Sequence, residues 1–163
     1  MGITMKTEND KIEETLEREN LKIPNLQTRI SAYIIDDALL SLIVFATVYG
    51  DIAALKVENG ILDGKALMGI ILTLVPLSIV LVFIYHWLFI TLYGSTLGKM
   101  LCKIRVVDTT MLDNPSYKQA AIRSFVRLIS AMLYYLPFIA IFADPFRRGF
   151  HDKLAKTIAL SLD

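Results

Sequence analysis

The chain has 163 residues, of which 55% are hydrophobic and 20% charged, and its mean hydropathy is +0.53. Soluble domains are about 45–50% apolar and about 25% charged, so this composition excludes an ordinary soluble domain and a disordered chain. The net charge of +1 excludes a strongly basic nucleic-acid-binding protein, and the single cysteine, Cys102, excludes an intrachain disulfide and a cysteine-based zinc site. We therefore expect one small integral membrane domain with the lipid bilayer as its partner, and no cofactor, metal or nucleic acid.

The first 27 residues are polar and carry both acidic and basic side chains. They lack the basic start and following apolar stretch of a signal peptide. Ile12 and Leu16 lie four residues apart, so a short helix would carry both on one face. We expect residues 1–27 to be a solvated, partly disordered cytoplasmic arm, with a docking helix for a partner protein as the alternative, and residues 28–163 to be the membrane domain.

Two apolar segments are long enough to cross a bilayer as helices. Residues 30–49 would rise about 30 Å and residues 66–93 about 42 Å, against a hydrocarbon core of about 30 Å. The second of these segments contains no Asp, Glu, Lys or Arg. We expect both segments to be transmembrane helices.

A third apolar segment is shorter and carries basic residues at both ends. Only residues 128–143 are free of charge; as a helix they would rise about 24 Å, and Pro137 lies within them. The loop between the first two spans has two Lys and Arg residues, whereas the second loop has four, which predicts that the second loop and the N-terminus are cytoplasmic. The tail after the third segment is basic as well. We therefore expect this segment to be short or broken, with both of its ends in the cytoplasm.

Two runs with β-strand character flank the third segment. Residues 103–108 are rich in β-branched side chains, and residues 157–162 alternate with Ile158, Leu160 and Leu162 on one face. These runs can pair only if both lie on one side of the membrane. The predicted fold class is thus an all-α integral membrane protein with two transmembrane helices, a third short or broken membrane segment and a small cytoplasmic β-strand pair.

Charged side chains inside the apolar segments are the main chemical signal. Asp36 and Asp37 lie in the first segment, where a carboxylate costs about 2.5–3.5 kcal/mol at a helix centre, so they must face protein or water, or be protonated. Arg29 shares a helix face with Asp36 but lies about 10 Å away along the axis. We expect Arg123 and Arg127, four apart on one helix face, to be the partners of Asp36.

Two interpretations of these charged residues are open. The first is a path for Na⁺ or H⁺, because intramembrane carboxylates mark ion paths and burial beside an arginine tunes the pKa of a carboxyl group. This interpretation requires a homo-oligomer, because three segments rarely enclose a path. The second is a structural network that holds the segments together in a non-transporting scaffold or assembly factor. No nucleophile–base pair stands out, so we do not expect an enzyme.

A glycine-rich loop, Gly94-Ser95-Thr96-Leu97-Gly98-Lys99, follows the second span. A phosphate-binding P-loop has four residues between its glycines and a Ser or Thr after its lysine. This loop has three residues between the glycines, and Met100 follows the lysine. We interpret it as a turn at the membrane exit with an anchoring lysine, and not as a nucleotide site.

The order and spacing of several short motifs are more specific than any one of them. In chain order they are Arg29, Ala32, Ile35 and Asp36; Gly94, Thr96, Gly98 and Lys99; Val106-Val107-Asp108; Ala120 and Arg123; and His151, Asp152, Ala155 and Thr157. Together they resemble the RDD family of bacterial membrane proteins over about residues 24–162. One departure is Lys156, where the family usually has glycine.

The resemblance implies that the name-giving arginine and two aspartates of the family are Arg29, Asp36 and Asp152, and that Asp37 is an additional carboxylate. It also implies a location in the bacterial inner (plasma) membrane. Some members of the family are described as sodium/proton antiporters, and a eukaryotic relative is associated with membrane-protein quality control. The first role agrees with an ion path, and the second with a scaffold.

Overall fold

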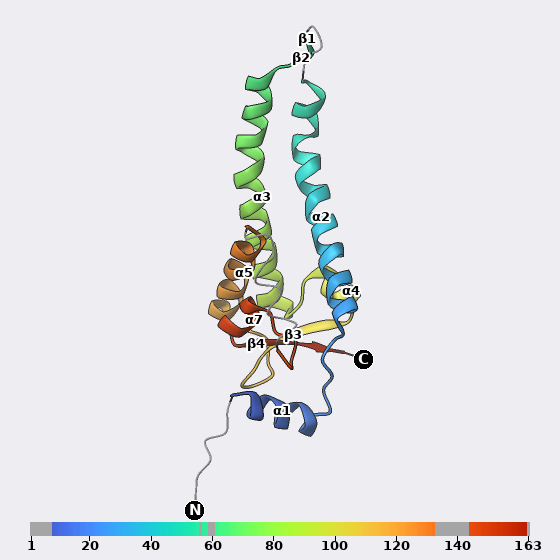
Figure 1. Ribbon diagram of the computed structural model, residues 1–163, viewed down its shortest axis with the longest axis vertical. Coiled ribbons are helices and arrows are strands. Elements are labelled where there is room, and N and C mark those ends of the chain that lie inside the picture. The colour runs from blue at the N-terminus through green and yellow to red at the C-terminus, as the bar shows by residue number, and fades with distance from the viewer. Residues whose placement is uncertain (1–7, 56, 59–60, 133–143, 163) are drawn as a thin grey trace, which may run out of the picture.

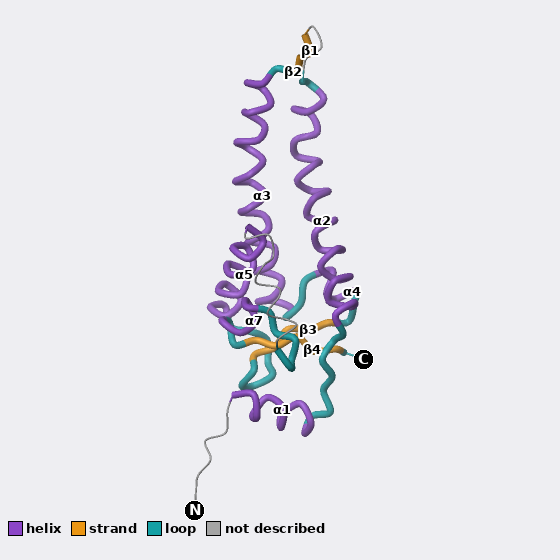
Figure 2. Tube along the Cα trace, viewed as in Figure 1, coloured by secondary structure: helices purple, strands orange, loops and turns teal. Residues whose placement is uncertain are grey.

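Two long helices dominate the structure and rise together from a smaller cap (Figures 1 and 2). They are α2 (Leu26–Ala53) and α3 (Gly64–Tyr93), and the short antiparallel strands β1 (Val57–Glu58) and β2 (Ile61–Leu62) join them at the end far from the cap. All other elements belong to the cap. This computed structural model describes residues 8–55, 57–58, 61–132 and 144–162.

The helices α2 and α3 have the length and composition of transmembrane helices. Many of their large apolar side chains are exposed, among them Leu42, Phe45 and Leu72. Soluble proteins rarely expose apolar surface of this extent, whereas lipid accepts it without cost. The two helices expected over residues 30–49 and 66–93 are therefore confirmed as long apolar helices.

Local capping explains where the long helices begin and end. The Asn25 side chain accepts a hydrogen bond from the Thr28 N–H at 2.7 Å at the start of α2, and Asp63 caps the start of α3. Helix α3 ends at Gly94, which adopts a left-handed conformation with φ +66°. That conformation favours glycine, and the chain turns there into the short helix α4 (Leu97–Leu101).

A two-stranded antiparallel sheet forms the centre of the cap. Strand β3 (Ile104–Asp108) pairs with β4 (Thr157–Ser161), with Ile104 opposite Ser161 and Asp108 opposite Thr157. The strand pair expected from residues 103–108 and 157–162 is confirmed. Because these strands are distant in sequence, their pairing brings the C-terminal tail back to the loop that follows α3.

The third apolar segment has both of its flanks in the cap. Helix α5 (Tyr117–Met132) lies beside the lower part of α3, and α7 (Phe150–Leu154) leads directly into β4 (Figure 1). The expected segment at residues 128–143 begins within α5, whereas residues 133–143, including Pro137, lie outside the described residues. Both flanks lie at the same end of the molecule. This agrees with the expectation that both ends of the third segment are on one side of the membrane.

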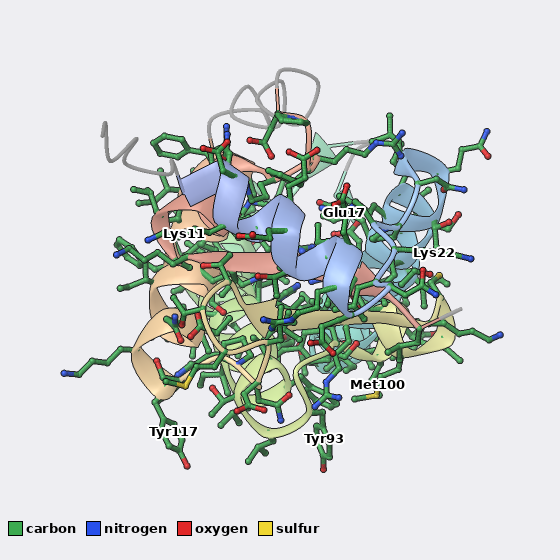
Figure 3. All side chains as sticks on the ribbon, turned by 90° about the horizontal axis from the view of Figure 1, so that it is seen from below. Lys11, Glu17, Lys22, Tyr93, Met100 and Tyr117 are labelled. Atoms are coloured by element: carbon green, nitrogen blue, oxygen red, sulfur yellow. The ribbon has the colours of Figure 1, made fainter. Side chains whose placement is uncertain are left out.

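Side chains from both faces of the sheet are buried. On one face, Ile158 and Leu160 pack against Ile12 and Leu16 of helix α1 (Glu8–Arg18), which lies across the sheet in the view from below (Figure 3). On the other face, Ile104, Val106 and Ala159 pack with side chains of α2, α3 and α5. The short helix with Ile12 and Leu16 on one face is confirmed. That face is not solvated, because it packs on this chain's own sheet.

Candidate functional site

Asp36 lies in a closed polar site between α2, α3 and α4. Its side chain is 1% exposed and accepts three hydrogen bonds: from the Tyr85 hydroxyl at 2.6 Å, from the Thr96 hydroxyl at 2.6 Å and from the Gly98 N–H at 2.8 Å. The Tyr85 oxygen in turn accepts a hydrogen bond from the Leu97 N–H at 3.0 Å. One carboxylate therefore connects three helices through neutral donors.

The glycine-rich loop is shaped around this carboxylate. Thr96 is the N-cap of α4, and the N–H groups at the start of a helix have no partner within it, so they are available to a carboxylate. Gly98 brings α4 against α2: a Cβ there would overlap the Ala32 carbonyl oxygen and lie 2.9 Å from Asp36 Oδ1. Thr96 and Gly98 were predicted from the motif, but their contact with Asp36 was not.

The prediction that Arg123 and Arg127 pair with Asp36 is wrong. Arg123 instead pairs with Asp152 and donates to the Thr157 hydroxyl at 2.7 Å. The Arg127 guanidinium lies over the Tyr33 ring, 4.9 Å from its centroid. The physical reason is that α4 and Tyr85 occupy the space facing Asp36 and supply uncharged donors, so the carboxylate needs no basic partner.

Asp152 is the centre of a second polar site, in the cap. Arg123 pairs with one of its oxygens, and Arg29 Nη1 lies 3.8 Å from the other, which also accepts the Gly149 N–H at 2.9 Å. Arg29 donates to the Arg147 carbonyl oxygen at 2.8 Å as well. These contacts join the first turn of α2 to α5 and to the C-terminal tail.

The environment of the cap site shifts the pKa of two adjacent side chains. Burial disfavours the charged form of His151 and lowers its pKa to about 3, although Asp152 acts in the opposite direction. Burial alone would raise the pKa of Asp152, but Arg123 and Arg29 outweigh burial and hold that pKa well below its usual range. At neutral pH the site therefore contains a neutral imidazole and a charged carboxylate.

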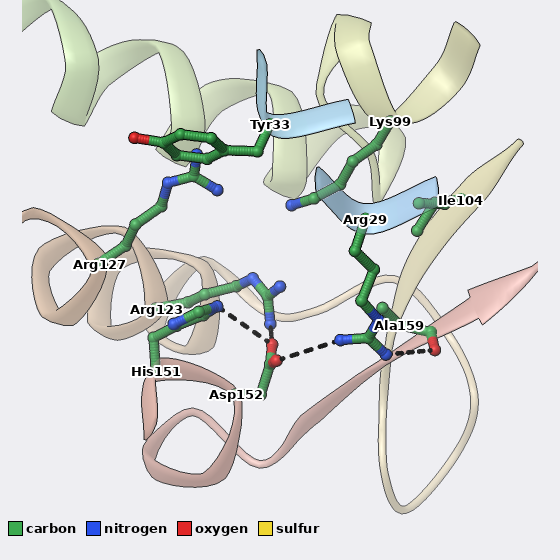
Figure 4. A pocket seen from close by; sticks show the side chains of 9 residues that line it. All are labelled: Arg29, Tyr33, Lys99, Ile104, Arg123, Arg127, His151, Asp152 and Ala159. Carbon is green, nitrogen blue, oxygen red and sulfur yellow. Dashed lines mark hydrogen bonds and ion pairs between the residues drawn. The ribbon is translucent and has the colours of Figure 1, made fainter. Parts of the chain in front are cut away.

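A cavity of about 50 Å³ opens beside the Asp152 site, between α2, α4, α5, α7 and the sheet (Figure 4). The Lys99 side chain points into it from α4. Burial and the neighbouring Arg123 and Arg127 keep the pKa of Lys99 well below its usual range. Lys99 was expected to anchor the chain at the membrane surface, whereas the structure places it inside the cap. The lining side chains are Arg29, Tyr33, Lys99, Ile104, Arg123, Arg127, His151, Asp152 and Ala159.

Asp37 lies apart from both polar sites. It is exposed on α2 and lines a second cavity of about 170 Å³, between α2, α3 and α5, together with Ser78 and His86. Asp36 and Asp37 therefore face different surroundings, although they are adjacent on α2. Within the described residues, no group of three or more His, Cys, Asp or Glu could hold a metal ion.

Sequence reasoning missed the role of Tyr85. The signal available was a hydroxyl group on a largely apolar helix, where a buried polar atom needs a partner. That signal does not identify which of the charged or polar residues is the partner.

These features define the class of protein: an apolar helical hairpin whose base is joined by buried polar side chains to a mixed helical and β-stranded cap. The RDD family model matches residues 23–156, which is most of the chain. The chain belongs to the RDD family. No curated protein and no solved structure matches it. Of the residues that give the family its name, Arg29 and Asp152 contact each other in the cap, and Asp36 lies in the separate site between the helices.

Proposed function

We propose that this protein is a non-transporting membrane scaffold or assembly factor whose buried carboxylates hold its helices in one arrangement. The observation that supports this proposal is the full engagement of Asp36, which is 1% exposed and accepts three hydrogen bonds. A carboxylate that carries a proton or cation has to be reached from water and released again. Here Tyr85, Thr96 and Gly98 would all have to withdraw first.

The second polar site supports the same role. Asp152 connects Arg29 at the start of α2 to Arg123 on α5. The Asp36 and Asp152 sites therefore both join the long helices to the cap. The exposed apolar side chains of α2 and α3 remain available to lipid and to the membrane segments of a partner. A rigid base with apolar outer faces is what a membrane-embedded assembly factor requires.

The deciding experiment is a flux assay in proteoliposomes that contain a pH-sensitive dye and receive pulses of sodium, potassium or lithium. We expect the wild-type protein and Asp36→Asn to give the same signal as empty liposomes. A sodium–proton-exchanging ionophore, added at the end, provides the positive control for vesicle tightness. A cation-dependent signal from the wild type that Asp36→Asn abolishes would refute the scaffold proposal.

Transport of Na⁺ or H⁺ by a homo-oligomer is the second candidate, and a separate observation favours it. Asp37 is exposed on an apolar helix and shares a cavity of about 170 Å³ with Ser78 and His86. Such a carboxylate is reachable without breaking the Asp36 contacts. If this candidate is right, the flux assay gives a signal that Asp37→Asn abolishes.

We further propose that the protein resides in the bacterial inner membrane with its cap in the cytoplasm, on the basis of the Lys and Arg distribution. Single cysteines test the orientation in a Cys102→Ser background. Met111→Cys, on an exposed turn of the cap, reacts with an impermeant maleimide only after the membrane is opened. Asp51→Cys, near the far end of α2, reacts in intact spheroplasts; the reverse pattern contradicts the orientation.

A further inference from the structure

The cavity in Figure 4 contains more positive than negative charge. Asp152 is the only carboxylate among the described residues that line it, and His151 is neutral at physiological pH because its pKa is about 3. Three guanidinium groups line the same cavity, those of Arg29, Arg123 and Arg127, and Lys99 adds a fourth basic side chain. The lining is therefore suited to an anion.

The existing contacts do not use all of this positive charge. Arg29 and Arg123 share the single carboxylate of Asp152, and Arg29 Nε is buried with no hydrogen-bond partner. The Lys99 side-chain nitrogen has no hydrogen bond or ion pair within the part of the chain that the structure describes. Asp36 is close enough to attract Lys99, but its oxygens already accept three hydrogen bonds. Clustered cations with little access to water repel one another unless an anion lies between them.

We propose that this cavity binds the phosphate group of an anionic ligand. A phosphate offers several acceptor oxygens in a tetrahedral arrangement, which suits planar guanidinium groups and a lysine ammonium together. The volume of about 50 Å³ is several times the roughly 10–15 Å³ that one water molecule needs. Asp152 stays with Arg123 and Arg29, while Lys99 and Arg127 face the ligand from the opposite side (Figure 4).

A second cavity indicates the source of the phosphate group. It has a volume of about 170 Å³ and shares Tyr33 and Arg127 with the first, so the two lie side by side. It lies between the long helices and α5, and most of its lining is apolar. An acyl chain would suit this second cavity while the headgroup phosphate occupies the first, so an anionic phospholipid is favoured over free phosphate. The apolar lining residues are Leu40, Ile79, Val82, Leu128 and Ala131.

This site differs from the P-loop that the sequence excluded. A P-loop binds phosphate with the backbone N–H groups of its glycine-rich turn. Here the Gly98 N–H donates to Asp36, and only the Lys99 side chain of this loop reaches the cavity. The proposal does not depend on the scaffold role, because a transporter could hold the same ligand.

The test measures thermal unfolding of the full chain in neutral detergent, monitored by the fluorescence of Trp87, the only tryptophan. Three additives are titrated at matched ionic strength: phosphatidylglycerol, phosphatidylcholine with the same acyl chains, and inorganic phosphate. The variants are Lys99→Gln and, as a matched control, Lys118→Gln, which removes an exposed lysine of α5. We expect phosphatidylglycerol to raise the unfolding midpoint of the wild type and of Lys118→Gln, and its apparent affinity to fall about tenfold in Lys99→Gln.

Each other outcome has a defined meaning. If inorganic phosphate alone raises the midpoint, and this depends on Lys99, the site stands and its ligand is a free phosphate. If neither phosphatidylglycerol nor inorganic phosphate stabilises the protein, the proposal is overturned. It is also overturned if Lys99→Gln binds phosphatidylglycerol as tightly as the wild type does. In the absence of anion, Lys99→Gln unfolds at a temperature no lower than the wild type, because the folded chain no longer buries an amine beside Arg123 and Arg127; a lower midpoint would also overturn the proposal. Should Lys99→Gln not fold, Arg127→Gln takes its place with the same expected loss of affinity.

Discussion

Replacing Asp36 by alanine tests whether this carboxylate is a structural connection. The substitution removes the acceptor for the Tyr85 hydroxyl, the Thr96 hydroxyl and the Gly98 N–H at once. Each buried donor left without a partner costs about 1–3 kcal/mol, so the three together cost about 3–9 kcal/mol. The free energy of unfolding of a whole domain is only about 5–15 kcal/mol. We therefore expect Asp36→Ala to lose much of its stability.

The neighbouring aspartate supplies the matched control. Asp37 lies on the same helix, is exposed, and has no hydrogen bond or ion pair within the described residues. Asp37→Ala removes the same chemical group and changes the free energy of unfolding by about 0.5 kcal/mol or less. Asp36→Asn keeps an acceptor oxygen for Tyr85 and Gly98, so its loss is expected to lie between those of the two alanine variants.

The assay is denaturant-induced unfolding of purified protein in detergent, followed by Trp87 fluorescence. The difference in the free energy of unfolding between Asp36→Ala and Asp37→Ala is the decisive quantity. A difference below about 1 kcal/mol would refute the reasoning, because a single unpaired buried donor already costs about that much. Such a result would mean that water or a shifted α4 replaces the carboxylate without loss.

Three further predictions follow from the same contacts. Gly98→Ala places a Cβ against the Ala32 carbonyl oxygen and Asp36, so we expect a loss of about 1–3 kcal/mol in denaturant unfolding, whereas Gly69→Ala, which meets no atom within 4 Å, is neutral or slightly stabilising. Arg123→Gln leaves Asp152 buried without its closest cation and costs about 3–5 kcal/mol by the same assay, whereas Arg105→Gln, an exposed change on β3, costs about 0.5 kcal/mol or less. Acid destabilises the protein, because the pKa of His151 is about 3 in the folded chain and about 6.5 in the unfolded one, so the unfolded chain binds a proton first. The free energy of unfolding therefore falls by about 1.36 kcal/mol per pH unit below pH 6.5, or about 2 kcal/mol by pH 5, and His151→Gln flattens this dependence.

The sequence predicted the elements that depend on local pattern. The apolar runs around residues 30–49 and 66–93 became α2 and α3, because a long apolar stretch satisfies its backbone only as a helix in lipid. The alternation in residues 157–162 predicted strand β4, and the β-branched run in residues 103–108 predicted its partner β3. These predictions needed no knowledge of which side chains meet across the molecule.

The partners of Asp36 could not be predicted in the same way. A search for opposite charges pointed to Arg123 and Arg127, whereas the actual donors are two hydroxyl groups and one backbone N–H. Backbone N–H groups occur at every residue, so nothing in the sequence marks the one at Gly98 as a donor. Its role follows from how closely α4 approaches α2, which only the three-dimensional structure reveals.

The packing partner of α1 could not be predicted from the sequence either. Ile12 and Leu16 define an apolar face, but a face of this kind packs equally well on a partner or on its own chain. The structure selects the second, since both side chains pack against Ile158 and Leu160 of β4. Helix α1 lies before the start of the family match at residue 23, so the RDD family model does not describe it.

The two polar sites share one face of α2, which links their behaviour. Arg29 and Asp36 lie seven residues apart on that face, one in the cavity of the cap and the other in the closed site above it. Helix α4 also contributes one residue to each site: the Gly98 N–H donates to Asp36, and the adjacent Lys99 side chain points into the cavity. An anion that holds Lys99 in the cavity would therefore also hold α4 against Asp36. The proposed ligand of the cap would thus stabilise the base of the hairpin, and the cap and the two long helices would respond to it as one unit.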